Sequence, residues 1–442
     1  MREFGRRSEM RSLLTRIGAL QVLGGLVFFL RTKVIALVLG PSGVGVVSVI
    51  DQFVQLMLQL SALAIPFAAI KVLSKAHSES TETFRATYAG LLRLLLILGS
   101  IGAGLGIGLI ALRPSWASGS LAAHAPLVAI GLLALPAMIL HGFFRNVPAA
   151  ALRPITSAVW DVATAAIMTT FVIAGIMLFS VLGYFVGALV GCVLVSLSYY
   201  LYLARRFGLS IAGRPISVRG LLKDNPSLVE LSLASYVGSF VTPLALLVVR
   251  AMVLENFGVA TAGLLQAAIG ISLAINLVLN PLNGLVLTPL VNRMIAQTTK
   301  HREAEEFQKR LLFAIAIIAL PPILYPDLVV IVLYSHEFVE AAHALPWFVL
   351  SQAMIQIGGV YNVLMIGLDR LWGYAVVMVV GTALNVALAI ILVPPLGLLG
   401  AASQLSRAQA YWRSAHSAIS MRERASESAA RLASAHCSCL SD

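Results

Sequence analysis

The sequence has little charge and few cysteines. Only 11% of the 442 residues are charged, whereas 59% are hydrophobic, and the mean hydropathy is +0.92. A soluble protein of this length cannot bury that much apolar surface, which excludes the soluble globular classes. The three cysteines, Cys192, Cys437 and Cys439, provide neither a disulfide framework nor the spacing of a zinc site. We therefore expect a membrane protein without a structural metal.

The common catalytic motifs are also missing. The sequence has no nucleophile elbow, no Walker motif and no paired-carboxylate site, and its histidines show no metal-ligand spacing. A glycine-rich run at 102–108 lies inside a predicted spanning helix, where small residues allow close helix packing. The predicted outer connections are too short to hold a catalytic domain. We therefore expect that the protein is not an enzyme and uses no cofactor.

Apolar stretches of about 20 residues recur along the chain, the length that crosses a hydrocarbon core roughly 30 Å thick. The first stretch is not a cleavable signal peptide, because no small-residue cleavage site precedes the next basic cluster. We predict eleven spans, at 14–38, 44–73, 84–112, 121–143, 152–177, 180–204, 227–252, 258–292, 308–325, 343–367 and 371–394.

Basic residues gather on alternate connections between these spans. They precede the first span and follow the second, fourth, sixth and eighth, whereas the opposite connections carry Glu255, Asp327, Glu337 and Glu340. This distribution explains the net charge of +12 better than nucleic-acid binding does. The positive-inside rule then places the N-terminus in the cytoplasm. Pro326 and Asp327 are expected to end the ninth helix and begin a short interfacial segment.

Two parts of the chain resemble each other. Leu39–Val44 (LGPSGV) returns 215 positions later as Leu254–Val259 (LENFGV), and each is followed by a helix that contains a proline, Pro66 or Pro281. Six helices per half would bring the second half back in the same orientation, so the two lobes would be related by an axis along the membrane normal. Duplicated halves in an apolar chain are typical of transporters, whose substrate site lies between the halves. Pro66 and Pro281 are the predicted hinges.

The predicted fold is an all-α polytopic membrane protein with two pseudo-symmetric lobes of about six helices each. Residues 1–204 form the first lobe, 205–226 a basic cytoplasmic linker and 227–402 the second lobe. A twelfth helix should begin after Pro394–Ala402, but residues 403–442 are rich in Ser, Ala and Arg and contain no run that could span. Two interpretations of 403–442 stay open: a natural disordered tail, or a shifted reading frame near Ser403 that removed the twelfth helix.

Basic residues inside the predicted spans require a reason, since each costs at least ~2.5 kcal/mol on insertion scales. Arg31 lies about 22 Å beyond Arg16 along a helix, too deep for the cytoplasmic end. Lys33 follows, and it either faces the cavity or snorkels to the outer headgroups. Arg250 lies in the first helix of the second half. One deep arginine in each leading helix suggests a clamp for phosphate, which the paired donors of guanidinium suit.

Amide side chains form two stripes. Gln52, Gln55 and Gln59 follow Asp51 on the second helix, and the eighth helix carries Gln266, Asn276 and Asn280. Such stripes either join helices or face one wet cavity, and their matching places favour the cavity. Amides offer donors and acceptors together, as sugar hydroxyls require. Asp51 either pairs with Arg31 or exchanges protons or sodium as a coupling site. Arg93 and Asp161, also within helices, are candidates for buried partners.

Three segments carry a resemblance to a known family. Arg31–Gly45 (RTKVIALVLGPSGVG), Gly142–Arg145 and Leu396–Ala402 resemble Wzx-type oligosaccharide flippases of the multidrug/oligosaccharidyl-lipid/polysaccharide exporter superfamily. The likeness in layout covers residues 10–402. It implies two six-helix lobes around a central cavity in the bacterial inner membrane, and alternating access. The implied cargo is an undecaprenyl-diphosphate-linked oligosaccharide, moved from the cytoplasmic to the periplasmic leaflet for surface polysaccharide or O-antigen synthesis.

The resemblance also implies roles for residues and partners. Arg31, Lys33 and Arg250 would meet the diphosphate and the sugars of the cargo. Partners would be membrane lipids and other polysaccharide-assembly membrane proteins, with a monomeric chain and no nucleic acid. A cation-coupled multidrug exporter of the same superfamily is one alternative, but it should show acidic residues in its first helix, which has none between Ile17 and Val38. A membrane glycosyltransferase or polymerase is another, and it needs a longer periplasmic loop.

Overall fold

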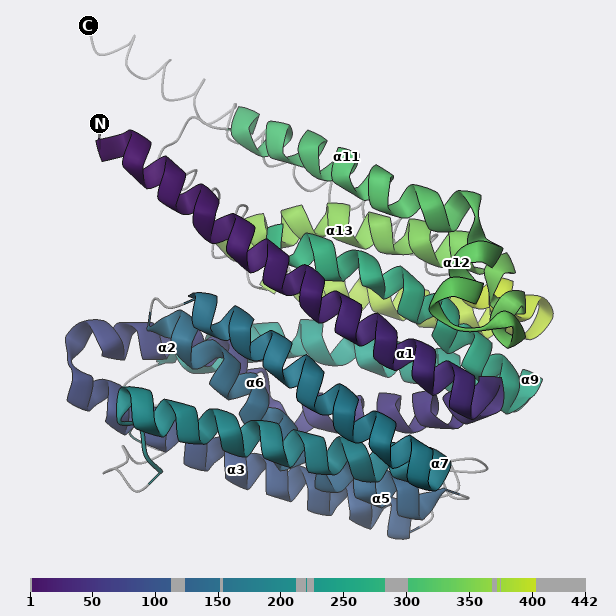
Figure 1. Ribbon diagram of the computed structural model, residues 1–442, viewed down its shortest axis with the longest axis horizontal. Coiled ribbons are helices and arrows are strands. Elements are labelled where there is room, and N and C mark those ends of the chain that lie inside the picture. Colours follow the sequence, from purple (N-terminus) through teal and green to yellow (C-terminus); the bar gives the residue numbers. More distant parts are fainter. Residues whose placement is uncertain are drawn as a thin grey trace, which may run out of the picture.

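The computed structural model describes residues 2–112, 124–151, 154–211, 226–282, 301–367 and 375–402, with residues 220, 372 and 373. Within these ranges every regular element is a helix, which confirms the all-α prediction (Figure 1). The elements are α1 (Arg2–Ala62), α2 (Ile65–Glu79), α3 (Thr81–Ala111), α5 (Ala125–Leu133), α6 (Leu135–Ala150), α7 (Pro154–Phe207), α9 (Pro226–Leu282), α11 (His301–Leu324), α12 (Pro326–Leu333), the 3₁₀ helix η3 (His336–His343), α13 (Leu345–Gly367) and a last helix, Ala375–Ala402.

Three of the long helices contain a sharp turn. Gly40 in α1 has φ 61° and Gly258 in α9 has φ 83°, while α7 turns at Phe179 and Ser180. Positive φ interrupts the α-helix, and glycine adopts it without steric cost. Figure 1 shows α1 running the length of the molecule before the chain turns back. The turn in each of these helices lies at the boundary between two of the predicted spans. The predicted span at 44–73 is divided between α1 and α2, because the chain leaves the helix at Leu63 and Ala64.

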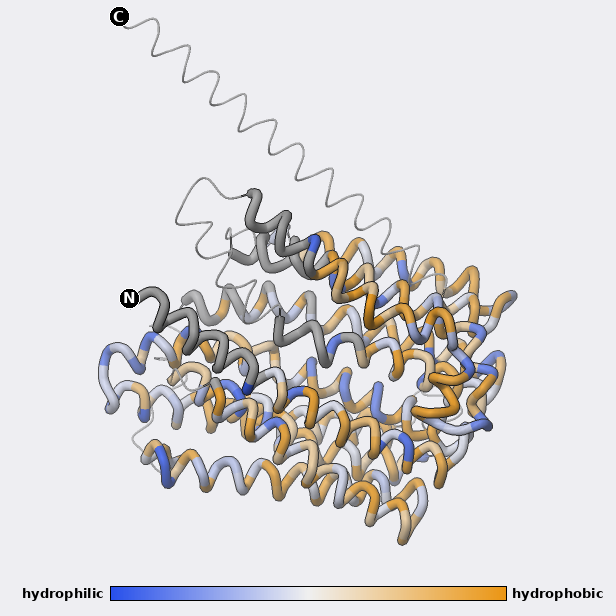
Figure 2. Tube along the Cα trace, turned by 45° about the horizontal axis from the view of Figure 1, so that its top comes forward, coloured by the Kyte–Doolittle hydropathy of each residue, from blue (hydrophilic) through white to orange (hydrophobic). Residues whose placement is uncertain are grey.

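The described helices are long and apolar enough for a multi-pass membrane protein. Six of them could cross a membrane, or up to eight if two bent pairs each count as one span. Figure 2 shows hydrophobic positions along the length of these helices. The bent pairs are α11 with α12, at 91°, and η3 with the start of α13, at 62°. The first of these bends confirms that the ninth helix ends before Pro326, whereas the number of crossings stays a prediction.

The hydrophobic core is divided between the halves. Two clusters of buried side chains come from residues between Val47 and Leu209. The third comes from residues between Val249 and Ala402, joined by Ala36 and Val44 of α1. The middle of α1 therefore packs into the core of the second half. There, the Lys33 Nζ donates a hydrogen bond of 2.6 Å to the carbonyl oxygen of Ile331.

The two halves touch closely where α1 crosses α9. A Cβ atom added to Gly45 would collide with the carbonyl oxygen of Val259, and one added to Gly263 would collide with that of Pro41. Both residue pairs, Gly45 with Gly263 and Pro41 with Val259, are 218 positions apart. Reciprocal contacts of this kind are what a two-fold relation produces.

This crossing corrects the predicted repeat offset of 215. The turn glycines Gly40 and Gly258 are also 218 positions apart, so Gly258 corresponds to Gly40 and not to Gly43. With the corrected offset, Arg31 corresponds to Val249, the neighbour of Arg250. Matching LGPSGV to LENFGV by residue identity aligns Gly258 with Gly43. The turn, however, lies at Gly40 and Gly258, where the backbone has positive φ.

The structure describes the chain at both predicted hinges, Pro66 and Pro281. The chain leaves the helix at Leu63 and Ala64, both with positive φ, and α2 begins one residue before Pro66, which suits a proline in the first turn. Pro281 lies at the end of the described part of α9, which stops at Leu282. The last helix breaks at Gly397, and Gly400 packs against the Leu392 carbonyl as Gly183 packs against that of Gly175. Residues 403–442, on which the missing twelfth helix was argued, lie outside the described residues.

Candidate functional site

Arg250 of α9 is a buried cation with few partners. Its side chain is 4% exposed. Its Nη2 donates to Gln266 Oε1 at 2.5 Å, while its Nε and Nη1 are buried without a hydrogen-bond partner. A guanidinium offers five donors and is expensive to bury unless they are used. Arg250 and Gln266, two of the predicted site residues, are therefore brought together, with donors left over.

Asp51 of α1 lies near both deep arginines. Its Oδ2 accepts a 2.6 Å hydrogen bond from the Tyr184 hydroxyl of α7, and its carboxylate interacts electrostatically with Arg31 and Arg250. Among the described side chains, no ion pair within 4 Å joins Asp51 to either arginine; the pairs found are Lys75–Glu79 and Arg145–Asp161. A direct pair with Arg31, one of the two roles predicted for Asp51, is thus not formed, and the Tyr184 hydroxyl is the hydrogen-bond partner instead.

Arg31 resembles Arg250 in having an unused donor. Its Nε is buried without a partner, and its guanidinium carbon lies 5.3 Å from the centre of the Phe28 ring. Tyr334, which follows α12, is 4% exposed and interacts electrostatically with Arg250. We define the central cluster by its members from α1, α7, α9 and the end of α12: Arg31, Asp51, Tyr184, Arg250, Gln266 and Tyr334.

Two members of the central cluster, Tyr184 and Tyr334, were not predicted. A tyrosine in an apolar helix carries little signal in the sequence, because core tyrosines are common. Lys33, which was predicted to join the arginines, instead binds the Ile331 carbonyl near the C-terminal end of α12, where cations are favoured. Lys33 therefore fastens α1 to the second half.

The amide side chains of each predicted stripe do not share one role, because they have different partners and different exposure. Gln52 is buried and donates to the Pro243 carbonyl of α9 at 3.0 Å, so it joins helices. Gln55 is exposed. Asn276 accepts from Gln352 at 2.7 Å and also from Gln356, both on α13. The side chain of Asn280 lies outside the described residues. Gln352 and Gln356 were missed, although their spacing of four residues is the signal that located the other amides.

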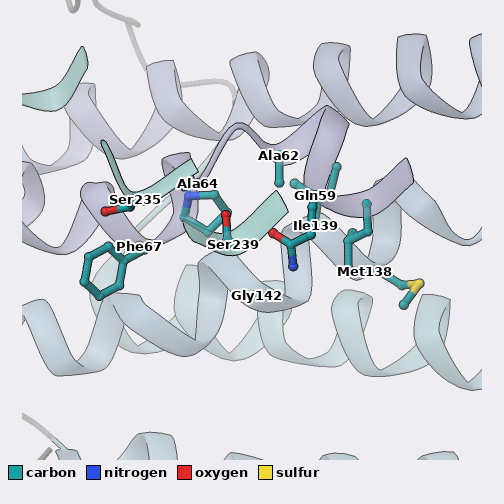
Figure 3. A pocket seen from close by; sticks show the side chains of 11 residues that line it. Gln59, Ala62, Ala64, Phe67, Met138, Ile139, Gly142, Ser235 and Ser239 are labelled. Carbon is teal, nitrogen blue, oxygen red and sulfur yellow. The ribbon is translucent and has the colours of Figure 1, made fainter. Parts of the chain in front are cut away.

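Gln59 lines a cavity of ≈ 460 Å³ between the two halves (Figure 3). The α1, α2 and α6 segments form one wall and α9 forms the other. We call it the Gln59 cavity, and its lining residues are Leu58, Gln59, Ala62, Ala64, Pro66, Phe67, Met138, Ile139, Gly142, Ser235 and Ser239. It lies farther from the turns at Gly40 and Gly258 than the central cluster does.

The other charges within helices have structural partners. Arg145 of α6 binds Asp161 of α7 through two contacts, Nε to Oδ1 at 2.8 Å and Nη2 to Oδ2 at 2.9 Å. Asp161 therefore has a structural partner as expected, but the pair is not buried, because the Arg145 side chain is 54% exposed. Arg93 donates twice to the Ile211 carbonyl. In the part of the chain that the structure describes, no group of three His, Cys, Asp or Glu could hold a metal ion.

Comparison with solved structures shows the fold of a membrane transporter. A MATE family multidrug resistance transporter of the MOP superfamily, in an inward-facing conformation, is similar with TM-score 0.67 and 18% identity over 91% of this chain and 96% of that chain. A MOP superfamily transporter from Pyrococcus furiosus, described as having a binding pocket of reversed polarity, gives 0.64 and 17% over 92% and 96%. The lipid II flippase MurJ gives 0.64 and 15% over 91% and 85%.

The family of the protein is identified by sequence comparison. Residues 15–295 match the model of the polysaccharide biosynthesis protein family, so the chain belongs to that family. A search of curated protein sequences finds no match. The resemblance argued from Arg31–Gly45 is thereby confirmed at the level of family and fold.

Proposed function

We propose that this protein flips undecaprenyl-diphosphate-linked oligosaccharides from the cytoplasmic to the periplasmic leaflet of the bacterial inner membrane. The observation that carries the proposal is the pair of deep arginines, Arg31 and Arg250, each with a buried donor that no group among the described residues accepts. Family membership supports a role in polysaccharide synthesis. The cargo would supply the oxygens that the two guanidinium groups lack.

A diphosphate suits the central cluster for two reasons. Guanidinium binds phosphate oxygens through paired hydrogen bonds and stays charged in an apolar environment. The two arginines also outnumber the single carboxylate of Asp51, so the cluster carries an excess of positive charge. Bringing an anion there replaces part of the hydration that the diphosphate loses on entering the membrane.

The arrangement of the halves supports alternating access between two lobes. The halves are closed against each other at the crossing of Gly45 and Gly263, and the Gln59 cavity lies between them on the other side of the central cluster. The corrected repeat offset supports a pseudo-symmetric pair of lobes with hinges at the Pro66 and Pro281 regions. With the N-terminus in the cytoplasm, the closed crossing lies on the periplasmic side.

A cation-coupled multidrug exporter remains the second candidate, since MATE transporters share the fold. Such a protein must bind cationic drugs, and the excess positive charge of the central cluster opposes that. Asp51 would be the coupling group in that case. The net charge of the cluster therefore favours an anionic cargo.

The test is complementation of cells that lack their own oligosaccharide flippase. The readout is surface polysaccharide, compared between the chain and an Arg31→Ala, Arg250→Ala double variant at matched membrane abundance. We expect the chain to restore surface polysaccharide and the double variant to lose it. A chain that is stable in the membrane but restores nothing, even with a twelfth helix added after Ala402, would overturn the proposal.

A further inference from the structure

We infer that the Gln59 cavity is the seat of a sugar residue of the cargo, separate from the diphosphate clamp. The inference rests on the proposed function, since it assigns the cavity to another part of the same cargo. The volume of ≈ 460 Å³ falls within the range of small-molecule sites, about 300–1,000 Å³.

The position of the cavity fits a sugar that lies beyond the diphosphate. Gln59 follows Asp51 by eight residues on α1, and Ser239 precedes Arg250 by eleven residues on α9. At about 1.5 Å per residue, these intervals correspond to roughly 12 and 16 Å along the two helices. Because the two helices run in opposite directions, both intervals lead away from the turns at Gly40 and Gly258. A cargo held by its diphosphate at the central cluster could thus extend its oligosaccharide into the cavity.

The lining supplies the two kinds of contact that a sugar ring needs. Eight of the eleven lining residues are apolar, and one of them, Phe67, is 51% exposed. Three are polar: Gln59 on one wall, and Ser235 and Ser239 one turn apart on the other. Figure 3 shows the Gln59 amide and the Ser239 hydroxyl near each other, with Phe67 to one side and Met138 to the other. Sugars combine C–H faces, which pack on apolar side chains, with hydroxyl groups that donate and accept.

The unused polar groups argue against a prenyl chain as the occupant. Within the described part of the chain, neither the Gln59 amide nor the Ser235 hydroxyl has a hydrogen-bond partner, and the Ser239 hydroxyl donates only to the Tyr236 carbonyl. A hydrocarbon occupant would leave the Gln59 amide dehydrated and unpaired, which costs free energy. Sugar hydroxyls would satisfy it.

Gly142 has no side chain, so it leaves the cavity open. This explains why a glycine begins the Gly142–Arg145 segment. A Cβ atom added to Gly142 meets nothing within 4 Å, and the residue lines the cavity from α6. Its neighbours in the segment have other tasks, since Phe143 and Phe144 are buried in the core and Arg145 binds Asp161. A larger side chain at Gly142 should therefore fill the cavity without disturbing the backbone.

The experiment compares Gly142→Leu with Gly104→Leu. Both replace a helical glycine whose added Cβ meets nothing within 4 Å, but Gly104 lies on the exposed face of α3. Two probes are bound to the purified full-length chain in detergent: bare undecaprenyl diphosphate, and the undecaprenyl-diphosphate-linked oligosaccharide that accumulates in flippase-deficient cells. Gln59→Leu serves as a second variant that removes only the polar group.

We expect Gln59→Leu to weaken binding of the sugar-bearing lipid about tenfold, the effect of one or two lost hydrogen bonds. Gly142→Leu should weaken it at least as much, because its side chain occupies the space of the sugar. Binding of the bare lipid should be unchanged, and Gly104→Leu should change neither. Equal weakening of both lipids would place the prenyl chain in the cavity and overturn the inference, as would no weakening of either. If the unsubstituted chain binds neither lipid, the proposed function itself fails.

Discussion

Arg145 and Arg250 are both arginines within apolar helices, but their surroundings differ. Arg145 is half-exposed, and its guanidinium makes two contacts with the Asp161 carboxylate. Arg250 is almost fully buried, and its one hydrogen bond is to the neutral amide of Gln266. The charge of Arg145 is neutralised by its direct partner, whereas the charge of Arg250 is only partly balanced by Asp51, which lies beyond ion-pair distance.

The difference separates structural charges from binding charges. A buried cation without a paired anion lowers stability, so its retention needs a compensating function. Where the protein needs a charge only for structure, as at Arg145, it provides a carboxylate in contact. At Arg31 and Arg250 it leaves buried donors unused among the described residues. This comparison predicts that substitutions in the two regions affect stability and binding in opposite proportions.

The largest effect should come from Arg250→Met. The unbranched apolar side chain keeps the packing but removes the charge, so binding of undecaprenyl diphosphate should fall at least about 30-fold, as for a lost buried charge contact. Thermal stability should stay the same or rise, because an uncompensated buried charge is removed. Equilibrium binding and thermal unfolding of the purified protein measure the two. A variant that unfolds at lower temperature but binds normally would make Arg250 a structural residue.

The second largest effect should come from Gly45→Leu, which tests the close contact between the two halves where α1 crosses α9. A Cβ atom added at Gly45 would collide with the Val259 carbonyl at the crossing of α1 and α9, whereas one added at Gly104 meets no atom within 4 Å. We expect Gly45→Leu to destabilise the protein by about 1–3 kcal/mol, the usual effect of overpacking. It should also abolish restoration of surface polysaccharide. Identical thermal unfolding and complementation for both variants would show that the halves do not need to meet at Gly45.

The sequence was sufficient to predict those features that depend on local chemistry. Apolar runs predicted helices, and the cost of charge in a membrane singled out Arg31 and Arg250. Glycine at Gly40 and Gly258 permits the turns, but identity alone paired Gly258 with Gly43, because the two segments LGPSGV and LENFGV differ in where the turn falls.

The partners of these residues could not be predicted in the same way. Whether Gln52 binds a ligand or a helix depends on the Pro243 carbonyl, which the crossing of α1 and α9 brings into reach. Tyr184 and Tyr334 join the central cluster only through tertiary packing of α7 and α12. Asp51 is an example. The sequence predicts that Asp51 is a charged group inside a span, but it does not predict its hydrogen-bond partner, the Tyr184 hydroxyl 133 positions away.

A smaller effect is expected at Asp51. Asp51→Asn keeps the shape and can still accept from Tyr184, but it removes the negative charge that opposes an incoming anion. Binding of undecaprenyl diphosphate should become about 3- to 10-fold tighter, since charge interactions at this range are worth of order 1 kcal/mol. Tyr184→Phe is the matched control, because it removes the hydrogen bond and leaves the charge. Weaker binding by Asp51→Asn would mean that Asp51 positions the arginines instead of competing with the cargo for them.

The smallest effect on binding should come from Asp161→Asn. The substitution removes the anion of the Arg145 pair while keeping a side chain that can accept from Gln21 and Arg145. Because Arg145 is largely solvent-exposed, the pair is worth at most about 1 kcal/mol. Thermal unfolding should shift slightly downward while binding of both lipids stays unchanged, the reverse of the pattern for Arg250→Met. If Asp161→Asn weakened lipid binding as strongly as Arg250→Met does, a paired arginine would matter as much to the cargo as an unpaired one, and unused donors would no longer identify the site.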